Sequence, residues 1–126
     1  MAKIMLVDDD QITQSVLVRI LERNGHDVVV AQTGKEATER AKDVLPALIV
    51  MDMNMPEMDG LEATRLIKRD DKTKHIPVLL LSIHSMPSYL IKASTIDESC
   101  NDYDTKPIDV GRFMSKVNTL LTPVVS

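Results

Sequence analysis

The sequence predicts an α/β fold, a doubly wound parallel sheet of five strands in the order 2-1-3-4-5 with five helices around it. Short apolar runs alternate with stretches whose apolar residues recur at helical spacing. No long linker, repeat or low-complexity tract interrupts this alternation over 126 residues, a length that suits one domain. Strands that alternate with helices imply right-handed crossovers and a central parallel sheet that is covered on both faces.

The first half of the chain contains three predicted strands and two predicted helices. In order, they are a strand at Ile4–Val7, a helix at Gln11–Asn24, a strand at Asp27–Ala31, a helix that begins after Thr33, and a strand at Ala47–Asp52. Asp10 and Thr33 are the predicted N-caps of the two helices. Gly25 stops the first helix and Pro46 ends the second. The third strand is apolar up to its last residue, as a strand covered on both faces requires.

The second half of the chain repeats the alternation. The predicted elements are a helix around Leu61–Ile67, a strand at Val78–Ser82, a helix at Pro87–Ser99, a strand at Cys100–Asp104, and a helix at Val110–Leu121. Gly60 marks the loop before the third helix, and Pro77 opens the fourth strand. The last helix has the clearest amphipathic pattern of the chain.

Charge and composition exclude several classes of partner. A net charge of −4 and a pI near 5.3 argue against a nucleic-acid surface. No apolar run reaches the length of a membrane span, and the N-terminal residues lack a signal-peptide pattern. Cys100 is the single cysteine of the sequence, so no internal disulfide can form, and we expect a cytoplasmic protein.

Aspartates stand where two of the predicted strands end. Asp8 and Asp9 follow the first strand, and Asp52 ends the third. These strands are neighbours in the order 2-1-3-4-5, and such sheets bind ligands at the switch point between them. Carboxylates that lie so close need neutralisation, most simply by a cation such as Mg²⁺, which keeps positions open for phosphate oxygens. Ser82 ends the fourth predicted strand and Lys106 follows the fifth, so this edge of the sheet suits phosphoryl transfer. In such a reaction a carboxylate can itself be the nucleophile.

Four motifs make the chain resemble the receiver domain of response regulators in two-component signal transduction, of the chemotaxis-regulator type. They are Val7-Asp8-Asp9-Asp10, the run from Met51 to Gly60, Ser82, and Tyr103-Asp104-Thr105-Lys106-Pro107. The resemblance runs from Lys3 to about Leu121 and implies a flavodoxin-like receiver fold. It also implies that residues 1–126 are one receiver domain without an output domain, in a phosphoacceptor signalling protein rather than an enzyme.

The resemblance implies a phosphoacceptor and a cation. Asp52 would attack the phosphorus of a phosphohistidine on a sensor histidine kinase or a phosphotransfer protein. Asp9 and Asp52 would bind Mg²⁺ directly, with Mn²⁺ as a substitute. Asp8 would act mainly through water, and Asn54 would contribute its backbone carbonyl.

The remaining motif residues would respond to phosphorylation. Lys106 would pair with Asp52 at rest and with a phosphate oxygen afterwards, and Ser82 would hydrogen-bond another phosphate oxygen. Tyr103 would then turn inward and repack the face formed by the fourth helix, the fifth strand and the fifth helix, which a downstream protein reads. The Lys106–Pro107 peptide bond is cis in this family, which would aim the lysine.

Three differences separate the chain from the family pattern. Ile83 is bulkier than the usual residue after Ser82 and would slow phosphate exchange. His84 occupies a position that tunes the lifetime of the acyl phosphate, and its imidazole titrates near neutral pH. Ser99-Cys100 replaces a Gly-Ala-like pair, so the end of the preceding helix is expected to be irregular or mobile.

Two other functions compete with this interpretation. A Mg²⁺-dependent phosphohydrolase with an aspartyl-phosphate intermediate would need a second acid two residues after the nucleophile, where the chain has Asn54. A degenerate receiver would bind its partner without phosphorylation, but the acidic, hydroxyl and lysine positions are all present. The chain also resembles receivers attached to hybrid sensor kinases, and its sequence does not separate an excised receiver from a stand-alone regulator.

Overall fold

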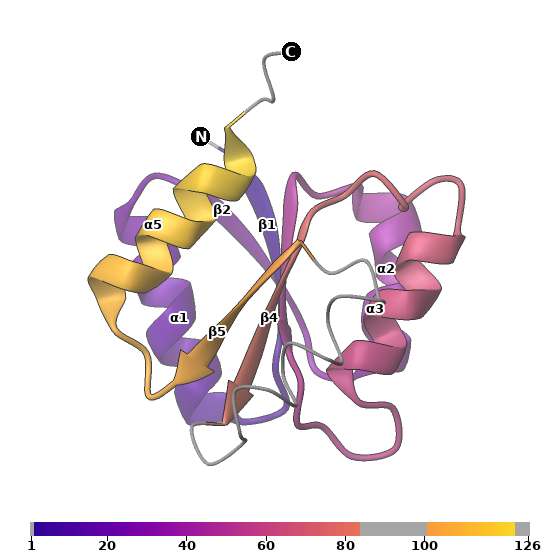
Figure 1. Cartoon of the computed structure of the whole chain (residues 1–126), viewed down its shortest axis with the longest axis horizontal. Helices are drawn as coiled ribbons and strands as arrows, with labels where there is room; N and C mark the ends of the chain where they lie inside the picture. The colour runs from indigo at the N-terminus through magenta and orange to yellow at the C-terminus, as the bar shows by residue number, and fades with distance from the viewer. Residues whose placement is uncertain (1, 84–100, 123–126) are drawn as a thin grey trace.

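The computed structural model describes residues 2–83 and 101–122, which form one parallel sheet with helices around it. The strands lie in the order β2-β1-β3-β4-β5 (Figure 1), which confirms the predicted topology. They are β1 (Lys3–Val7), β2 (Asp27–Ala31), β3 (Leu48–Asp52), β4 (Val78–Ile83) and β5 (Asp102–Lys106). β3 is buried along its whole length, and this explains why its sequence is apolar up to the final aspartate.

The described helices cover both faces of the sheet (Figure 1). They are α1 (Gln11–Arg23) and α5 (Val110–Leu121) on one face, and α2 (Gly34–Val44) and α3 (Gly60–Arg69) on the other. The helix predicted at Pro87–Ser99 lies outside the described residues, as does the irregular end expected at Ser99-Cys100. Among the described helices, none combines the length and the apolar content that a membrane crossing needs.

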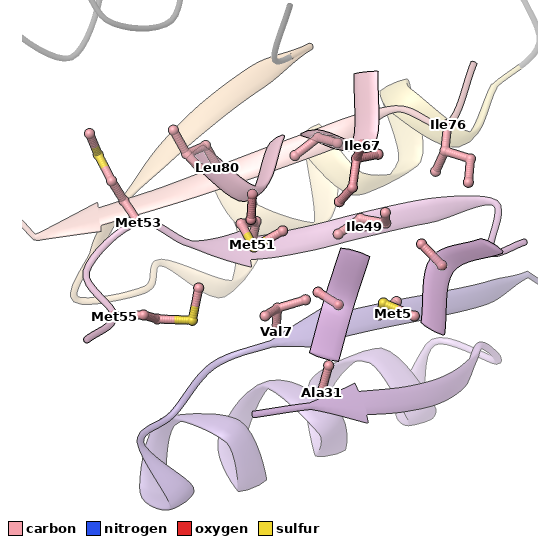
Figure 2. Packing of buried hydrophobic residues seen from close by; sticks show 14 residues of the cluster. Met5, Val7, Ala31, Ile49, Met51, Met53, Met55, Ile67, Ile76 and Leu80 are labelled. Carbon is pink, nitrogen blue, oxygen red and sulfur yellow. The ribbon is translucent and has the colours of Figure 1, made fainter. Parts of the chain in front are cut away.

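Each face of the sheet packs its own hydrophobic core. Because successive strand residues point to opposite faces, Val7 and Leu6 of β1 belong to different cores. On one side, Val7 packs in the cluster that includes Ile67 of α3 (Figure 2). On the other side, Leu6 packs with Leu17 of α1 and Phe113 of α5. These two cores fix the sheet between the helix layers and so fix the positions of the strand ends.

A short polar side chain caps the beginning of each described helix. The N-caps are Asp10, Thr33, Asp59 and Asp109, and each side chain accepts a hydrogen bond from the backbone N–H three residues later. Such a cap satisfies a donor that the first helical turn leaves unpaired. The predicted caps Asp10 and Thr33 are therefore confirmed. Gly25, the predicted stop, follows α1 with a φ of 86°.

The predicted bounds of the fifth strand, Cys100–Asp104, differ from those in the structure. Cys100 lies outside the described residues, Asn101 is not part of a strand, and β5 runs from Asp102 to Lys106 alongside β4. Asp102 and Asp104 are poor strand formers by composition, but cations of α5 pair with both of them. Lys106 is the last residue of the strand rather than part of the loop that follows it.

Candidate functional site

The carboxyl ends of β1 and β3 bring the three predicted acids together. Asp8 follows β1 directly and Asp52 ends β3, and the register pairs Val7 with Met51 just before them. One carboxylate oxygen each of Asp8, Asp9 and Asp52 lies within 4.8 Å of the other two. The strand order therefore converts two separate sequence motifs into one acidic cluster.

The acidic cluster is buried on one side and open on the other. Asp8 and Asp52 are buried, whereas Asp9 is exposed. Asp8 Oδ1 accepts a hydrogen bond from the backbone N–H of Asp10 at 2.9 Å, and Gln14 Nε2 donates to the Asp8 carbonyl oxygen at 2.9 Å. These bonds tie the start of α1 to the end of β1. Gln14 was not singled out from the sequence, because a glutamine in the first turns of a helix carries no distinctive signal.

The ammonium group of Lys106 lies between two of the acids. Its Nζ atom is 3.2 Å from Asp8 Oδ2 and 3.2 Å from Asp52 Oδ1. The peptide bond between Lys106 and Pro107 is cis. The structure thus shows the lysine contact with Asp52 that the resemblance implies, and it adds a second contact with Asp8.

Burial and neighbouring charges shift the pKa values of Asp52 and Lys106. Burial raises the pKa of Asp52, the Lys106 ammonium lowers it and the Asp8 carboxylate raises it, so that it lies above its ordinary value. Burial lowers the pKa of Lys106, but the carboxylates of Asp52 and Asp8 outweigh burial and raise it above its ordinary value. The lysine therefore stays charged, whereas the ionised form of Asp52 is destabilised by its surroundings.

The acidic cluster fits a hard divalent cation. It places three carboxylates around a single ammonium group, which leaves an excess of negative charge and an all-oxygen ligand set. Such a ligand set is the one that Mg²⁺ prefers. The exposed side of the cluster, at Asp9, leaves access for water or phosphate oxygens. Asn54 lies beside the cluster, where its backbone N–H donates to Asp52 Oδ1 at 3.2 Å. That its carbonyl oxygen binds the cation stays a prediction.

Ser82 and Tyr103 stand on the two neighbouring strands. Ser82 is buried, and its hydroxyl has no hydrogen-bond partner among the described residues. A buried hydroxyl without a partner is unfavourable, and a phosphate oxygen would supply one. Tyr103 is partly buried, with its ring centroid 5.5 Å from Lys116 Nζ. The switching roles of Ser82 and Tyr103 stay predictions.

Ile83 ends β4 at the rim of the site. Its side chain is 42% exposed, and the register pairs it with Lys106 of β5. That Ile83 restricts access to the site stays a prediction. His84 lies outside the described residues, and its influence on phosphoryl lifetime stays a prediction.

Gly60 is a residue of the site that the sequence identified only as part of a loop. A Cβ atom at this position would lie 2.2 Å from the backbone oxygen of Asp52. The Gly60 N–H donates to the carbonyl oxygen of Met53 at 3.0 Å. The first turn of α3 therefore rests directly on the backbone of the predicted phosphoacceptor, an approach that a side chain would block.

Comparison with known proteins gives one consistent family. Residues 4–118 match the family described as Response regulator receiver domain. The polar-differentiation response regulator DivK of Brucella anthropi is 31% identical over 118 residues, which cover 94% of this chain and 94% of DivK.

Solved receiver structures share the fold. A putative response regulator from Chloroflexus aurantiacus has a TM-score of 0.89 and 27% identity, over 95% of this chain and 97% of that chain. The receiver of a signal transduction histidine kinase from Syntrophus aciditrophicus has a TM-score of 0.86 and 30% identity, over 100% and 98%. The receiver of the sensor histidine kinase PA1611 from Pseudomonas aeruginosa, with magnesium coordinated in its active-site cleft, has a TM-score of 0.85 and 24% identity, over 95% and 97%. Because the family match spans almost the whole chain and agrees with the fold and the acidic cluster, the chain belongs to the response regulator receiver domain family.

Proposed function

We propose that the protein accepts a phosphoryl group on Asp52 from the phosphohistidine of a sensor histidine kinase or a phosphotransfer protein, in a Mg²⁺-dependent reaction. It then signals through altered protein contacts. One observation carries this proposal: Asp52 is a buried carboxylate in contact with a lysine ammonium, inside a cluster of three acids. Its family consists of phosphoacceptor signalling proteins rather than classical enzymes.

The contacts of Asp52 favour one of its oxygens as the nucleophile. Lys106 Nζ and the Asn54 N–H both contact Oδ1, which leaves Oδ2 to attack phosphorus. A bond forms between Oδ2 and phosphorus while the bond from phosphorus to the histidine nitrogen breaks, and the imidazole leaves with the electron pair. Lys106 stabilises the negative charge on the phosphoryl oxygens as the transfer proceeds.

The acidic cluster supplies the cation site of this proposal. Asp8, Asp9, Asp52 and the backbone carbonyl of Asn54 would hold Mg²⁺, or Mn²⁺ in its place. The cation, when bound, neutralises charge on the phosphoryl oxygens. The PA1611 receiver, whose cleft contains magnesium, has the same fold as this chain.

Phosphorylation changes the charge at the end of β3 and so acts on β4 and β5. It adds roughly −1.5 to −2 charge and three acceptor oxygens. The hydroxyl of Ser82, which lacks a partner among residues 2–83 and 101–122, and the ammonium of Lys106 are the donors expected to turn toward these oxygens. Tyr103 then fills the space that Ser82 leaves. The surface that changes is formed by β5, α5 and the helix predicted at 87–99, and a downstream protein reads it.

Ile83 and His84 set how long the phosphoryl group remains on Asp52. Ile83 is partly exposed and pairs in register with Lys106, and we expect its bulk to limit access for water. The imidazole of His84 changes its charge near neutral pH, so the phosphoryl lifetime is expected to vary between about pH 5.5 and about pH 7.5. A lifetime that does not change over this range would contradict the role of His84.

An apolar surface on α1 suits the protein that donates the phosphoryl group. Ile12 and Val16 of α1 and Val110 of α5 are each more than half exposed, and they line a hollow of about 660 Å³. A second hollow is lined by Ile12, Val16 and Lys106 among others, so it shares residues both with this surface and with the site. An amphipathic helix of the donor would bury these side chains while it presents its phosphohistidine to Asp52.

The unit formed by residues 1–126 acts by protein contact in this proposal. We place it in the cytoplasm, where a sensor kinase presents its phosphohistidine, and we assign it no nucleic-acid or membrane partner. A net charge of −4 supports the first exclusion.

Intact-mass spectrometry tests the proposed function. The native chain is incubated with Mg²⁺ and acetyl phosphate, and we expect a gain of one phosphoryl group that requires Mg²⁺ and is lost in Asp52→Asn. Asp71→Asn is the matched control, because its carboxylate is 94% exposed, and it should be phosphorylated as the native chain is. Phosphorylation of Asp52→Asn would overturn the assignment. Continuous turnover of phosphomonoesters would favour the phosphohydrolase, which the amide at Asn54 opposes because it cannot protonate a leaving group.

A further inference from the structure

A third buried carboxylate, besides those of Asp8 and Asp52, stands on β5, two residues before Lys106 and outside the acidic cluster. Asp104 is 2% exposed. Its Oδ1 atom accepts hydrogen bonds from the Thr105 N–H at 2.8 Å and from Arg112 Nε at 2.6 Å. A buried carboxylate is stable where a cation and hydrogen-bond donors meet it. Arg112 is therefore the side chain that allows β5 to carry an acid at this position.

Arg112 holds both ends of the turn between β5 and α5. Its side chain binds Asp104 through Nε, and Nη2 donates to the carbonyl oxygen of Thr105 at 3.3 Å. Its backbone N–H donates to Oδ1 of Asp109, the N-cap of α5, at 2.9 Å. Three hydrogen bonds from one residue thus enclose the turn that contains the cis peptide bond.

The end of β5 needs such support because β5 is an edge strand. In the described sheet, β4 flanks β5 on one side and no strand flanks it on the other. Lys106 ends this strand, yet its Nζ atom must stay within 3.2 Å of carboxylates that come from β1 and β3. A displacement of about 1 Å at the strand end is enough to spoil a geometry of this kind.

We propose that Arg112 is a positioning residue for Lys106. By holding Asp104 and the Thr105 carbonyl, it fixes the end of β5 so that the Lys106 ammonium reaches the phosphoryl group during transfer to Asp52. This inference rests on the proposed function, since it concerns the rate at which Asp52 is phosphorylated. Arg112 acts through the strand and not by contact with the reacting atoms.

The test removes the ion pair without leaving a buried charge. Loss of Arg112 alone would leave Asp104 without its cation and would destabilise the fold. Asp104→Leu/Arg112→Met replaces both partners by apolar side chains of comparable volume, an exchange that proteins tolerate with little loss of stability. We expect a melting temperature close to that of the native chain and Mg²⁺ binding that is not weakened. The rate of phosphorylation by acetyl phosphate at saturating Mg²⁺ should fall by about fivefold to tenfold.

Two further variants make the result specific. Lys116→Met removes a second ion pair that the described residues place between β5 and α5, in which Nζ lies 3.3 Å from Asp102 Oδ1, and a hydrogen bond to the Tyr103 carbonyl oxygen at 2.9 Å. Because both contacts lie farther from Lys106 along the strand than those of Arg112, this variant should leave the rate unchanged. Arg112→Lys keeps a cation for Asp104 but lacks the planar fork that reaches the Thr105 carbonyl at the same time. It should fold and show a smaller loss of rate, and it decides the question if the double variant does not fold.

The outcomes separate this inference from the proposed function. A native rate in the folded double variant or in Arg112→Lys, with Asp52 still phosphorylated, would overturn the positioning role alone. If melting temperature, Mg²⁺ affinity and phosphorylation rate fell together, Arg112 would have a merely structural role, and this result would also overturn the positioning role. A native chain that is not phosphorylated on Asp52 would overturn both proposals.

Discussion

Replacement of Asp52 by asparagine should make the folded protein more stable at neutral pH when no divalent cation is present. Asp52 is 3% exposed and its pKa is raised, first by burial and also by the Asp8 carboxylate. An asparagine keeps an oxygen to accept the hydrogen bond that the Asn54 N–H donates at 3.2 Å. Lys106 keeps its contact with Asp8. The substitution therefore removes a destabilised charge while its neighbours retain partners.

The pH dependence follows from the direction of the pKa shift. A carboxyl group whose pKa is higher in the folded than in the unfolded chain binds its proton more tightly when folded. Its stabilising contribution is complete below the unfolded pKa, about 3.9, and is lost as the pH rises through the folded pKa. The advantage of Asp52→Asn should therefore grow with rising pH. We expect it to reach on the order of 1–2 kcal/mol near neutral pH, which lies within the range that single substitutions usually produce.

Urea unfolding monitored by circular dichroism measures this difference. The native chain, Asp52→Asn and the exposed control Asp71→Asn are compared in a chelator at several values between about pH 4 and about pH 7. Added Mg²⁺ should reduce the advantage of the variant, because it stabilises the native chain through the acidic cluster. The reasoning would be refuted if Asp52→Asn were less stable than the native chain near neutral pH. It would also be refuted if the stability advantage of the variant stayed constant down to about pH 4.

Four other substitutions give measurable outcomes. Lys106→Met should lower the free energy of unfolding near neutral pH by about 2–4 kcal/mol, since Asp8 would be buried without its cation. In urea unfolding, the difference in stability between this variant and the native chain should shrink at alkaline pH, where the native lysine, whose pKa is raised, loses its charge. Gly60→Ala should lower the unfolding free energy by about 2–4 kcal/mol, because its Cβ would meet backbone at 2.2 Å. Ile83→Ala should shorten the phosphoryl lifetime several-fold in a dephosphorylation time course. Val16→Glu should slow transfer from a phosphohistidine protein by about tenfold or more but leave phosphorylation by acetyl phosphate unchanged.

Each of these expectations has an outcome that contradicts it. Lys106→Met as stable as the native chain would mean that the lysine does not compensate the buried acid. A native stability for Gly60→Ala would show that α3 can move away from the end of β3. Unchanged phosphorylation and dephosphorylation rates in Ile83→Ala would exclude its role in access to the site. Equal slowing of both donors in Val16→Glu would point to a disturbed site rather than a docking surface.

The fold was predictable because local signals and tertiary structure agree in most of the chain. Asp10 and Thr33 cap the helices as predicted, and the apolar third strand is buried. β5 was the exception. Its charged residues Asp102 and Asp104 form ion pairs with residues of α5, later in the chain, and no local sequence pattern predicts such pairs. The start of this strand could therefore not be read from hydrophobic periodicity.

The candidate site was predictable as a set of positions but not as a set of contacts. Strand order alone places Asp8 beside Asp52, since both stand at the ends of neighbouring strands. The second contact of Lys106, to Asp8, depends on how far β5 extends, which the sequence did not define. The approach of Gly60 to the Asp52 backbone depends on the packing of α3, so it became visible only in three dimensions.

The location of the phosphoryl group tests the central claim most directly. After Mg²⁺-dependent phosphorylation by acetyl phosphate, borohydride reduces an aspartyl phosphate to homoserine, and peptide mass spectrometry identifies the modified residue. We predict homoserine at Asp52 alone, and none when Mg²⁺ is chelated. Homoserine at Asp8 or Asp9, or a phosphorylated chain that yields no homoserine at Asp52, would contradict the assignment of Asp52 as the phosphoacceptor.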